Sequence, residues 1–272
     1  MRVLAINDVS CVGRCSLTAS LPIISACGVE CNVLPTALLS THTGGFEGYT
    51  FRDLTTEING ILAHWKTLGL TFDFIYSGYL GSIEQIDLVE KVKADFLAEN
   101  GKFIVDPVMG DDGTLYEGFS QDYVAKMREL CRLADYILPN ATEACYLADL
   151  PYPLTEKTVS NALQRLKTFT RAPIITGVKS EKGISVCFTD KADTTCSFTH
   201  ENLEGFFCGA GDVFASAFVG CLANGKTETE AVRLASDFTA ACIARSAKEV
   251  PDKRYGLNFE AEIFTFLKKL NS

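Results

Sequence analysis

The sequence predicts a three-layer α/β/α protein, in which a doubly wound and mostly parallel sheet lies between two layers of helices. Short apolar segments alternate with longer amphipathic segments along most of the chain, which indicates strands that alternate with helices. The short segments are apolar throughout, as expected of strands that are covered on both faces. No linker, repeat or low-complexity stretch interrupts this pattern, so we expect one domain over residues 1–272.

The same pattern assigns the individual elements in order. The expected parallel strands are RVLAI (Arg2–Ile6), CNVLP (31–35), FDFIY (72–76), KFIV (102–105), DYIL (135–138) and APIITG (172–177). The expected helices cover residues 17–27, 54–68, 83–97, 123–133, 141–148, 159–169, 228–247 and 259–270, and one more begins near Asp212. Residues 38–50 are expected to form a loop. GISVCF and TTCSFTH alternate in polarity, which predicts paired antiparallel strands and an antiparallel edge near residues 194–199.

The charge balance excludes several classes of partner. The chain has a formal net charge of -9 and a sequence pI of about 4.9, and its Lys and Arg residues form no cluster. This composition argues against a nucleic-acid-binding protein and against a polybasic membrane attachment. Anionic small ligands stay open, because backbone N–H groups bind them without net positive charge.

The N-terminal segment and the cysteines favour a cytoplasmic protein. The apolar stretch after Met1 is too short for a signal peptide, and no apolar run is long enough to cross a membrane. The 11 cysteines show neither metal-binding nor CxxC spacing, so we expect reduced, mostly buried thiols. With three histidines, a histidine-rich metal site or a Ser-His-Asp site is not expected.

Polar residues follow the expected strands, at the edge where parallel sheets bind their ligands. They are Asn7-Asp8, Thr43-Gly44, Gly78-Tyr79, Asp106 to Asp112, Asn140 and Thr176-Gly177. Because the carboxyl ends of parallel strands meet at one edge, we expect these residues to converge on a small-molecule site.

The segment CGAGD offers the features of an anion hole. Gly209, Ala210 and Gly211 present little side chain, and the helix that follows supplies free N–H groups and the positive end of its dipole. Asp212 is then either an N-cap of this helix or a catalytic base. No Walker A sequence and no GxGxxG after the first strand occur, so the expected phosphate cradle is neither a P-loop nor a conventional dinucleotide fold.

The segment VDPVMGDDGTLY carries three acids, Asp106, Asp111 and Asp112, on a loop after a strand. Their carboxylate oxygens suit Mg²⁺. The alternative is an acidic surface turn, in which Asp112 and Gly113 only form the bend.

The segment LPNATEACYL places Asn140 after a strand and Glu143 three residues later. In one interpretation Glu143 holds a metal-bound water while Asn140 faces a phosphate. In the other the pair is a capping box that only starts the next helix.

Taken together, these segments resemble the motifs of the ribokinase superfamily: GAGD before a helix of small residues, DPVMGD after a middle strand, and PNxTE before a helix. Within that superfamily, INDVSCVGR, LLSTHTGGF, SGYLG and VDPVMGDDGTLY are most similar to the pyridoxal (vitamin B6) kinases. The resemblance runs from Arg2 to about Gly220, with the motifs in the family's order.

The resemblance implies transfer of the γ-phosphoryl group of ATP to the 5′-hydroxymethyl of pyridoxal, pyridoxine or pyridoxamine. It implies a cytoplasmic homodimer that uses Mg²⁺, and it leaves open a monovalent cation such as K⁺. Asp212 falls on the catalytic aspartate, with Gly209, Ala210 and Gly211 as its anion hole. The implied ATP side comprises Asp106, Asp111, Asn140, Glu143, Thr176 and Lys179. Of these, Asp106 is implied to lie near the metal ion, and Glu143 is implied to contact the metal through water. The implied B6 side comprises Asp8, Ser10, Thr43, Gly44, Tyr79 and Tyr116.

This chain departs from the family after its first strand. Many members carry a serine there, near the pyridine ring. Here the sequence is NDVSC, in which Asp8 matches by distance from the strand and Ser10 by chemistry.

The nearest rival function is that of another ribokinase-like enzyme, either a hydroxymethylpyrimidine kinase or a sugar kinase. The glycine-rich loops that these enzymes carry after the first strand are absent, although some bacterial relatives accept both heterocycles. A rival of another class is a non-catalytic carrier or sensor of ATP or a B6 vitamer, against which Asp212 and Glu143 argue.

Overall fold

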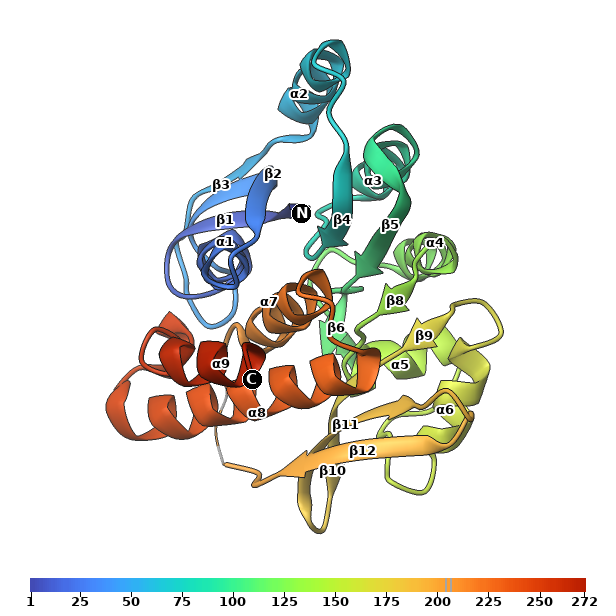
Figure 1. Cartoon of the computed structure of the whole chain (residues 1–272), viewed down its shortest axis with the longest axis vertical. Helices are drawn as coiled ribbons and strands as arrows, with labels where there is room; N and C mark the ends of the chain where they lie inside the picture. The colour runs from blue at the N-terminus through green and yellow to red at the C-terminus, as the bar shows by residue number, and fades with distance from the viewer. Residues whose placement is uncertain (204, 206) are drawn as a thin grey trace.

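The computed structural model describes residues 1–203, 205 and 207–272, and its centre is a seven-stranded sheet (Figure 1). In spatial order its strands are β3 (Phe51–Asp53), β2 (Glu30–Thr41), β1 (Arg2–Val12), β4 (Phe72–Ser77), β5 (Leu97–Val105), β8 (Tyr136–Ile137) and β9 (Ala172–Pro173). Every pairing is parallel except that of β3 with β2. The prediction of a mostly parallel sheet with an antiparallel edge is confirmed.

Helices cover both faces of the sheet, because its strands are apolar on both sides. In β1, Leu4 and Ile6 belong to the core beneath α2 (Thr55–Thr67), α3 (Ile83–Phe96), α4 (Gln121–Arg132), α5 (Ala141–Ala148) and α6 (Val159–Leu166). Val3 and Ala5 belong to the opposite core, beneath α1 (Ser16–Ala26), α7 (Ala210–Ala223), α8 (Glu228–Glu249) and α9 (Ile263–Leu270). Successive side chains of a strand point to opposite faces, so the alternation within β1 produces the predicted three layers.

A second, antiparallel sheet contains β10 (Ile175–Ser180), β11 (Gly183–Thr189) and β12 (Thr195–His200). GISVCF and TTCSFTH pair as predicted, but the segment near residues 194–199 forms an edge of this separate sheet. The antiparallel edge of the large sheet is instead β3, which is exposed and carries no apolar run that could reveal it. A short hairpin, β6 (Gly110–Asp111) with β7 (Thr114–Leu115), and the 3-10 helix η1 (Lys253–Tyr255) complete the elements.

Several predicted boundaries are wrong. β1 and β2 continue to Val12 and Thr41, so part of each predicted loop is strand, with Ser10 paired to Leu39. These extensions mix polar or exposed residues with buried apolar ones such as Leu39, and therefore lack the continuous apolar run of a strand that is covered on both faces. The final helix begins at Ile263, a turn later than predicted. The extent of the domain stays a prediction.

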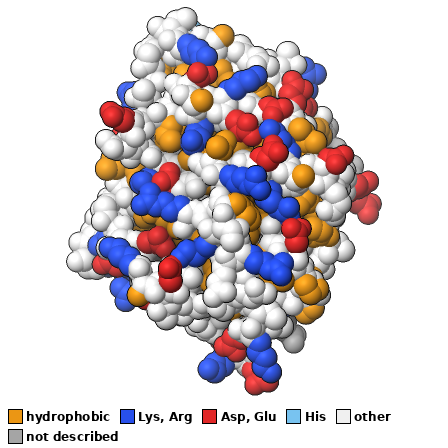
Figure 2. All heavy atoms as spheres, turned by 90° about the vertical axis from the view of Figure 1, so that its right-hand side faces the viewer, with side chains coloured by type: hydrophobic (Ala, Val, Ile, Leu, Met, Phe, Trp, Pro, Cys, Tyr) orange, Lys and Arg blue, Asp and Glu red, His pale blue; other side chains and the backbone are white. Residues whose placement is uncertain are grey.

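The surface shown in Figure 2 mixes basic and acidic side chains, with blue and red groups lying next to each other. Among the described residues, no helix combines the length and apolar character that crossing a membrane requires.

Candidate active site

Polar residues from neighbouring strands meet at one edge of the large sheet. The register aligns Ile6 of β1 with Ser77 of β4, and Ser77 with Val105 of β5. The residues that follow, Asn7, Gly78 and Asp106, therefore lie next to one another. Gly78 is required here, since a Cβ at this position would lie 2.3 Å from Nδ2 of Asn7. The predicted convergence at this edge is confirmed for these strands.

The CGAGD segment forms the start of α7, packed against the start of α1. Gly209 is the N-cap, with φ of +76°, and a Cβ on it would lie 2.3 Å from the carbonyl oxygen of Arg14. Only glycine meets both demands without strain. A Cβ on Gly211 would lie 3.7 Å from Oδ2 of Asp106, so the free N–H groups of α7 open beside that carboxylate.

Asp212 lies in the first turn of α7 and is not its cap. The helix begins at Ala210, two residues before the predicted start, and no side chain caps it. The Asp212 carboxylate instead accepts hydrogen bonds from Nδ2 of Asn7, at 3.1 Å, and from the backbone N–H of Ser16. The N-cap interpretation is therefore wrong, because the side chain points away from the N–H groups of its own helix.

Burial raises the pKa of Asp212 to about 7, and the charge of the nearby Asp8 also raises it. The donors Ser16 and Asn7 lower the pKa, but they do not offset this rise. A carboxylate with a pKa near neutrality accepts a proton from a substrate more readily than an ordinary aspartate. Ser16 has φ of +50°, an uncommon conformation for a residue with a side chain, which surrounding contacts must maintain.

Asn7 was expected at this edge of the sheet, but the sequence reasoning gave it no role of its own. Its Oδ1 accepts hydrogen bonds from the backbone N–H groups of Asp8 and Tyr79, which fixes the amide so that Nδ2 faces Asp212. The only signal in the sequence was its place directly after the apolar part of the first strand.

Asp106 is 7% exposed, and among the described residues no side-chain hydrogen bond reaches its carboxylate. Burial raises its pKa well above the usual value, and the carboxylates of Glu143 and Asp212 raise it further. A buried carboxylate without a protein donor is a costly group that a bound cation would stabilise. The oxygens of Asp106 therefore fit Mg²⁺.

Glu143 is almost completely buried, and its environment differs from that of Asp106. It accepts hydrogen bonds from the backbone N–H groups of Asn140 at 2.8 Å and of Met109 at 3.1 Å, and Gly110 donates as well. Asn140 in turn caps α5, so the capping box is present. Burial nevertheless raises the pKa of Glu143 to about 8. The capping interpretation is confirmed.

The other predicted residues of the ATP side lie around this corner. Thr176 forms a bridge with Asn140, continuing the pairing of β8 and β9. Asp111 is exposed on the β6–β7 hairpin. Lys179 lies 3.6 Å from Asp112, across the gap between β10 and that hairpin, and both side chains are exposed. Asp111 and Lys179 thus lie at the rim rather than in the buried cluster.

On the other side of Asp212, Asp8 and Ser10 form one unit. Ser10 donates a hydrogen bond to Oδ2 of Asp8 at 3.0 Å, and Ser16 donates to Oδ1. Burial raises the pKa of Asp8 in spite of both hydroxyl donors. The sequence left open which of Asp8 and Ser10 contacts a ligand, and the structure shows that the two side chains are hydrogen-bonded to each other.

The remaining predicted residues surround this unit at different depths. The N–H of Gly44 donates to Nδ1 of His42 at 3.0 Å, while Thr43 is exposed. Tyr79 lies beside Phe119, with ring centroids 6.1 Å apart, and burial followed by the charge of Asp8 raises its pKa to about 12. Tyr116 is 44% exposed and lies on the side of the site that contains Glu143 and Asp111.

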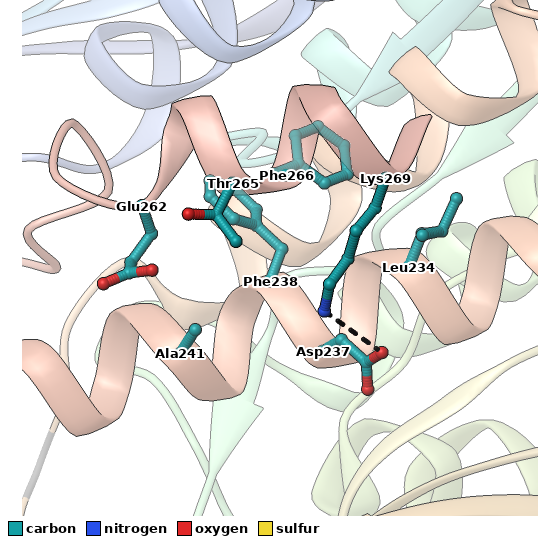
Figure 3. Close-up of a pocket in the computed structure, with 8 residues that line it drawn as sticks. All are labelled: Leu234, Asp237, Phe238, Ala241, Glu262, Thr265, Phe266 and Lys269. Atoms are coloured by element: carbon teal, nitrogen blue, oxygen red, sulfur yellow. Dashed lines mark ion pairs between the residues drawn. The ribbon is translucent and has the colours of Figure 1, made fainter. Parts of the chain in front are cut away.

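A separate surface groove lies between α8 and α9, lined by Phe238, Phe266 and the Asp237–Lys269 pair (Figure 3). It contains none of the predicted site residues.

Comparison with known proteins agrees with the motifs on a small-molecule kinase and finds relatives named for both candidate substrates. The family model for phosphomethylpyrimidine kinase matches residues 15–255. A solved structure of a candidate phosphomethylpyrimidine kinase from Bacteroides thetaiotaomicron is 36% identical with a TM-score of 0.92, covering 100% of this chain and 94% of that one. Another crystal form of that protein was solved with pyridoxal.

Two further relatives are pyridoxal kinases by description. The structure of pyridoxal kinase from Lactobacillus plantarum is 33% identical with a TM-score of 0.91, covering 98% of this chain and 96% of that one. A Caenorhabditis elegans protein described as a candidate pyridoxal kinase is 28% identical, with 80% of this chain and 73% of that one aligned.

Proposed function

Because the chain belongs to the phosphomethylpyrimidine kinase family, we propose that it transfers the γ-phosphoryl group of ATP to the 5′-hydroxymethyl of a B6 vitamer. It is a kinase, and its relatives include proteins described as pyridoxal kinases. One observation carries the proposal: a carboxylate with a pKa near 7, Asp212, lies in the first turn of the helix whose free N–H groups form an anion hole.

In the proposed reaction Asp212 accepts the proton of the hydroxyl as the new O–P bond forms. Asn7 and Ser16 hold the carboxylate in place, which limits the rearrangement needed during the reaction. The N–H groups at Gly209, Ala210 and Gly211 stabilise the charge on the transferring phosphoryl group. Phosphoryl transfer depends mainly on such positioning and charge stabilisation, and these residues supply both.

Asp106 and Glu143 are the residues we assign to Mg²⁺, which when bound would neutralise phosphate charge. Asp106 has free carboxylate oxygens for direct or water-mediated contact, whereas Glu143 is held by backbone donors and would act through water. Asn140 and Thr176 border the same corner, and Asp111 and Lys179 at the rim complete the proposed ATP side. A K⁺ requirement stays a prediction.

The B6 ring is assigned to the opposite side of Asp212. The Asp8–Ser10 unit offers a carboxylate and a hydroxyl for a ring nitrogen or hydroxyl group, and Tyr79 offers an aromatic face. We assign to the same side Thr43 and Gly44, of which Gly44 donates a hydrogen bond to His42, and Tyr116, which lies near Glu143.

A second candidate substrate is hydroxymethylpyrimidine, which the name of the matching family favours. Phosphorylation should be measured side by side with pyridoxal, pyridoxine, pyridoxamine and hydroxymethylpyrimidine, each with MgATP. We expect kcat/KM to be highest for one of the three vitamers. A higher value for the pyrimidine would overturn the B6 assignment, and binding of ATP without turnover of any substrate would favour a carrier or sensor.

We also propose a cytoplasmic homodimer. Apolar side chains are exposed on β3, on the neighbouring β2 and at the end of β1, where Phe51 is 46%, Leu38 44% and Val12 49% exposed. An exposed apolar sheet edge is a frequent site of association. Light scattering of the purified protein should give twice the monomer mass, and a monomeric mass would contradict the proposal.

A further inference from the structure

Thr43 and Gly44 lie between two residues that contact the same distant segment of the chain. His42, directly before them, is 9% exposed, and its Nε2–H donates a hydrogen bond to the carbonyl oxygen of Arg254 at 2.6 Å. Gly45, directly after them, accepts a hydrogen bond at its carbonyl oxygen from Nη1 of Arg254 at 2.9 Å. Arg254 therefore holds the chain on both sides of Thr43 and Gly44, once through its backbone and once through its side chain.

The imidazole of His42 extends this hold to the backbone of Gly44. A carbonyl oxygen only accepts hydrogen bonds, so Nε2 of His42 carries the proton and Nδ1 is an acceptor. The backbone N–H of Gly44 donates to Nδ1 at 3.0 Å. Both ring nitrogens are thus used, and one buried side chain joins the backbone of Arg254 to that of Gly44.

Phe46 adds a packed contact to these hydrogen bonds. Its ring meets the ring of His42 edge-on, with centroids 5.0 Å apart, and the ring of Tyr255 in the same way at 5.3 Å. The guanidinium carbon of Arg254 lies 4.8 Å from the centre of the Phe46 ring, which is the geometry of a cation–π contact. Hydrogen bonds and ring contacts therefore join the loop 42–46 to the same short helix, η1.

The side chain of Arg254 is oriented within the protein itself. Its Nε and Nη2 donate to the two carboxylate oxygens of Asp252 at 3.0 and 2.7 Å, and such a bidentate pair fixes the plane of the guanidinium. The backbone of η1 is anchored as well. The N–H of Arg14 donates to the carbonyl oxygen of Tyr255 at 3.0 Å, and a Cβ on Gly256 would lie 2.5 Å from the carbonyl oxygen of Arg14. The loop 42–46 is thus attached to the segment that leads into α1, beside the anion hole.

These contacts contribute more to the position of the loop than to the stability of the fold. The side chains of Arg254 and Asp252 are 47% and 35% exposed. Ion pairs at such exposure add little to the free energy of unfolding. The loop that they hold carries two of the residues assigned to the B6 ring.

We propose that Arg254 is a positioning residue for the vitamer: it holds Thr43 and Gly44 in place on the ring side of the site, and so sets the affinity for the vitamer rather than the rate of phosphoryl transfer. The inference rests on the proposed function, which assigns these two residues to the B6 ring. Among the described residues, the hydrogen bonds of Arg254 reach the loop 42–46 and Asp252, so the ATP side is unaffected.

The kinetic test compares Arg254→Ala with the matched control Arg2→Ala. Arg2 forms an ion pair with Glu30 and is 46% exposed, but it lies at the start of β1, at the end of the strand opposite to the site. If the loop keeps its position in about a tenth of the molecules, the apparent KM for the vitamer rises about 10-fold. We expect this rise in Arg254→Ala, with kcat and the KM for ATP near the wild-type values, and no change in Arg2→Ala. Arg254→Lys should recover part of the affinity, because an ammonium group still donates hydrogen bonds.

The second measurement needs no substrate: hydrogen–deuterium exchange of the backbone amides of residues 42–46, read by mass spectrometry. Exchange in this loop should rise about 10-fold in Arg254→Ala, because a hydrogen bond from a charged group is lost, while the melting temperature changes little. Unchanged exchange in the loop would overturn the proposal, as would a rise throughout the molecule, which indicates a structural role. A fall in kcat at an unchanged KM would overturn it too. Since no ligand is present, faster exchange confined to the loop supports the hold by Arg254 even if the proposed function fails.

Discussion

Three buried carboxylates lie within one corner of the molecule, and their hydrogen-bond donors differ. Asp212 has an amide and a backbone donor, Glu143 has backbone donors only, and Asp106 has none in the described part of the chain. A carboxylate held by two donors can still exchange a proton, whereas one without donors favours a cation. These differences are the reason for assigning base, capping and metal-binding roles to these residues.

The first residue-scale prediction concerns Asp212. Asp212→Asn removes the proton acceptor while keeping a side chain of the same size, so kcat should fall by about 10²- to 10⁴-fold, as for loss of a general base. ATP affinity, measured by calorimetry, should change little. Asp95→Asn, on the exposed side of α3, is the matched control and should retain activity. A kcat near the wild-type value in the Asp212 variant would refute the assignment.

The second residue-scale prediction concerns pH. The base must be deprotonated, so kcat/KM should rise with pH through the pKa of Asp212, about 7, rather than near 4. Asn7→Ala removes a donor that favours the charged carboxylate, so the midpoint should move to higher pH. A profile already flat at pH 5, or a midpoint unmoved in the variant, would contradict this interpretation.

At the scale of elements, the two ends of α7 offer a matched comparison. Gly209 before the helix and Gly225 after it both have positive φ, +76° and +78°, but only Gly209 has a neighbour that a Cβ would strike. Both substitutions by alanine should destabilise the fold by roughly 1 kcal/mol through backbone strain. Gly209→Ala should in addition lower kcat by about 100-fold, because it displaces the anion hole. Gly225→Ala should lose stability only.

Activity and thermal melting of these two glycine variants provide the measurement. Equal effects on kcat would show that the close approach of Gly209 to Arg14 does not position the site.

At the scale of the whole molecule, folding gathers Asp106, Glu143 and Asp212, each with a raised pKa. A carboxyl group whose pKa is higher in the folded state stabilises the fold below its unfolded pKa. That contribution is lost as pH rises towards the folded value. Without ligands, the melting temperature should therefore fall between pH 5 and pH 8.

Asp106→Asn should make this decline shallower, because it removes one of the three charges. Added MgATP should offset this decline of the melting temperature in the wild type. A melting temperature that rises steadily over this range in the ligand-free protein would contradict the raised pKa values.

Much of the element order could be predicted, because a strand covered on both faces must be apolar and a helix on a sheet must be amphipathic. The pattern failed where burial is one-sided: β1 and β2 extend beyond their apolar parts, and β3 is wholly exposed. The start of α7 was misplaced because Gly209 caps it through backbone conformation, which leaves no side-chain signature.

The sequence by itself determined the order of strands and helices and the polar residues after each strand, because hydrophobic periodicity and strand ends are local properties of the chain. Only the tertiary structure decided that Asn7 and Ser16 hold Asp212, and that in the described part of the chain Asp106 lacks a donor where Glu143 has several. These relations join residues far apart in sequence. Their burial and hydrogen bonds, and hence their pKa values, exist only once the strands and helices have packed.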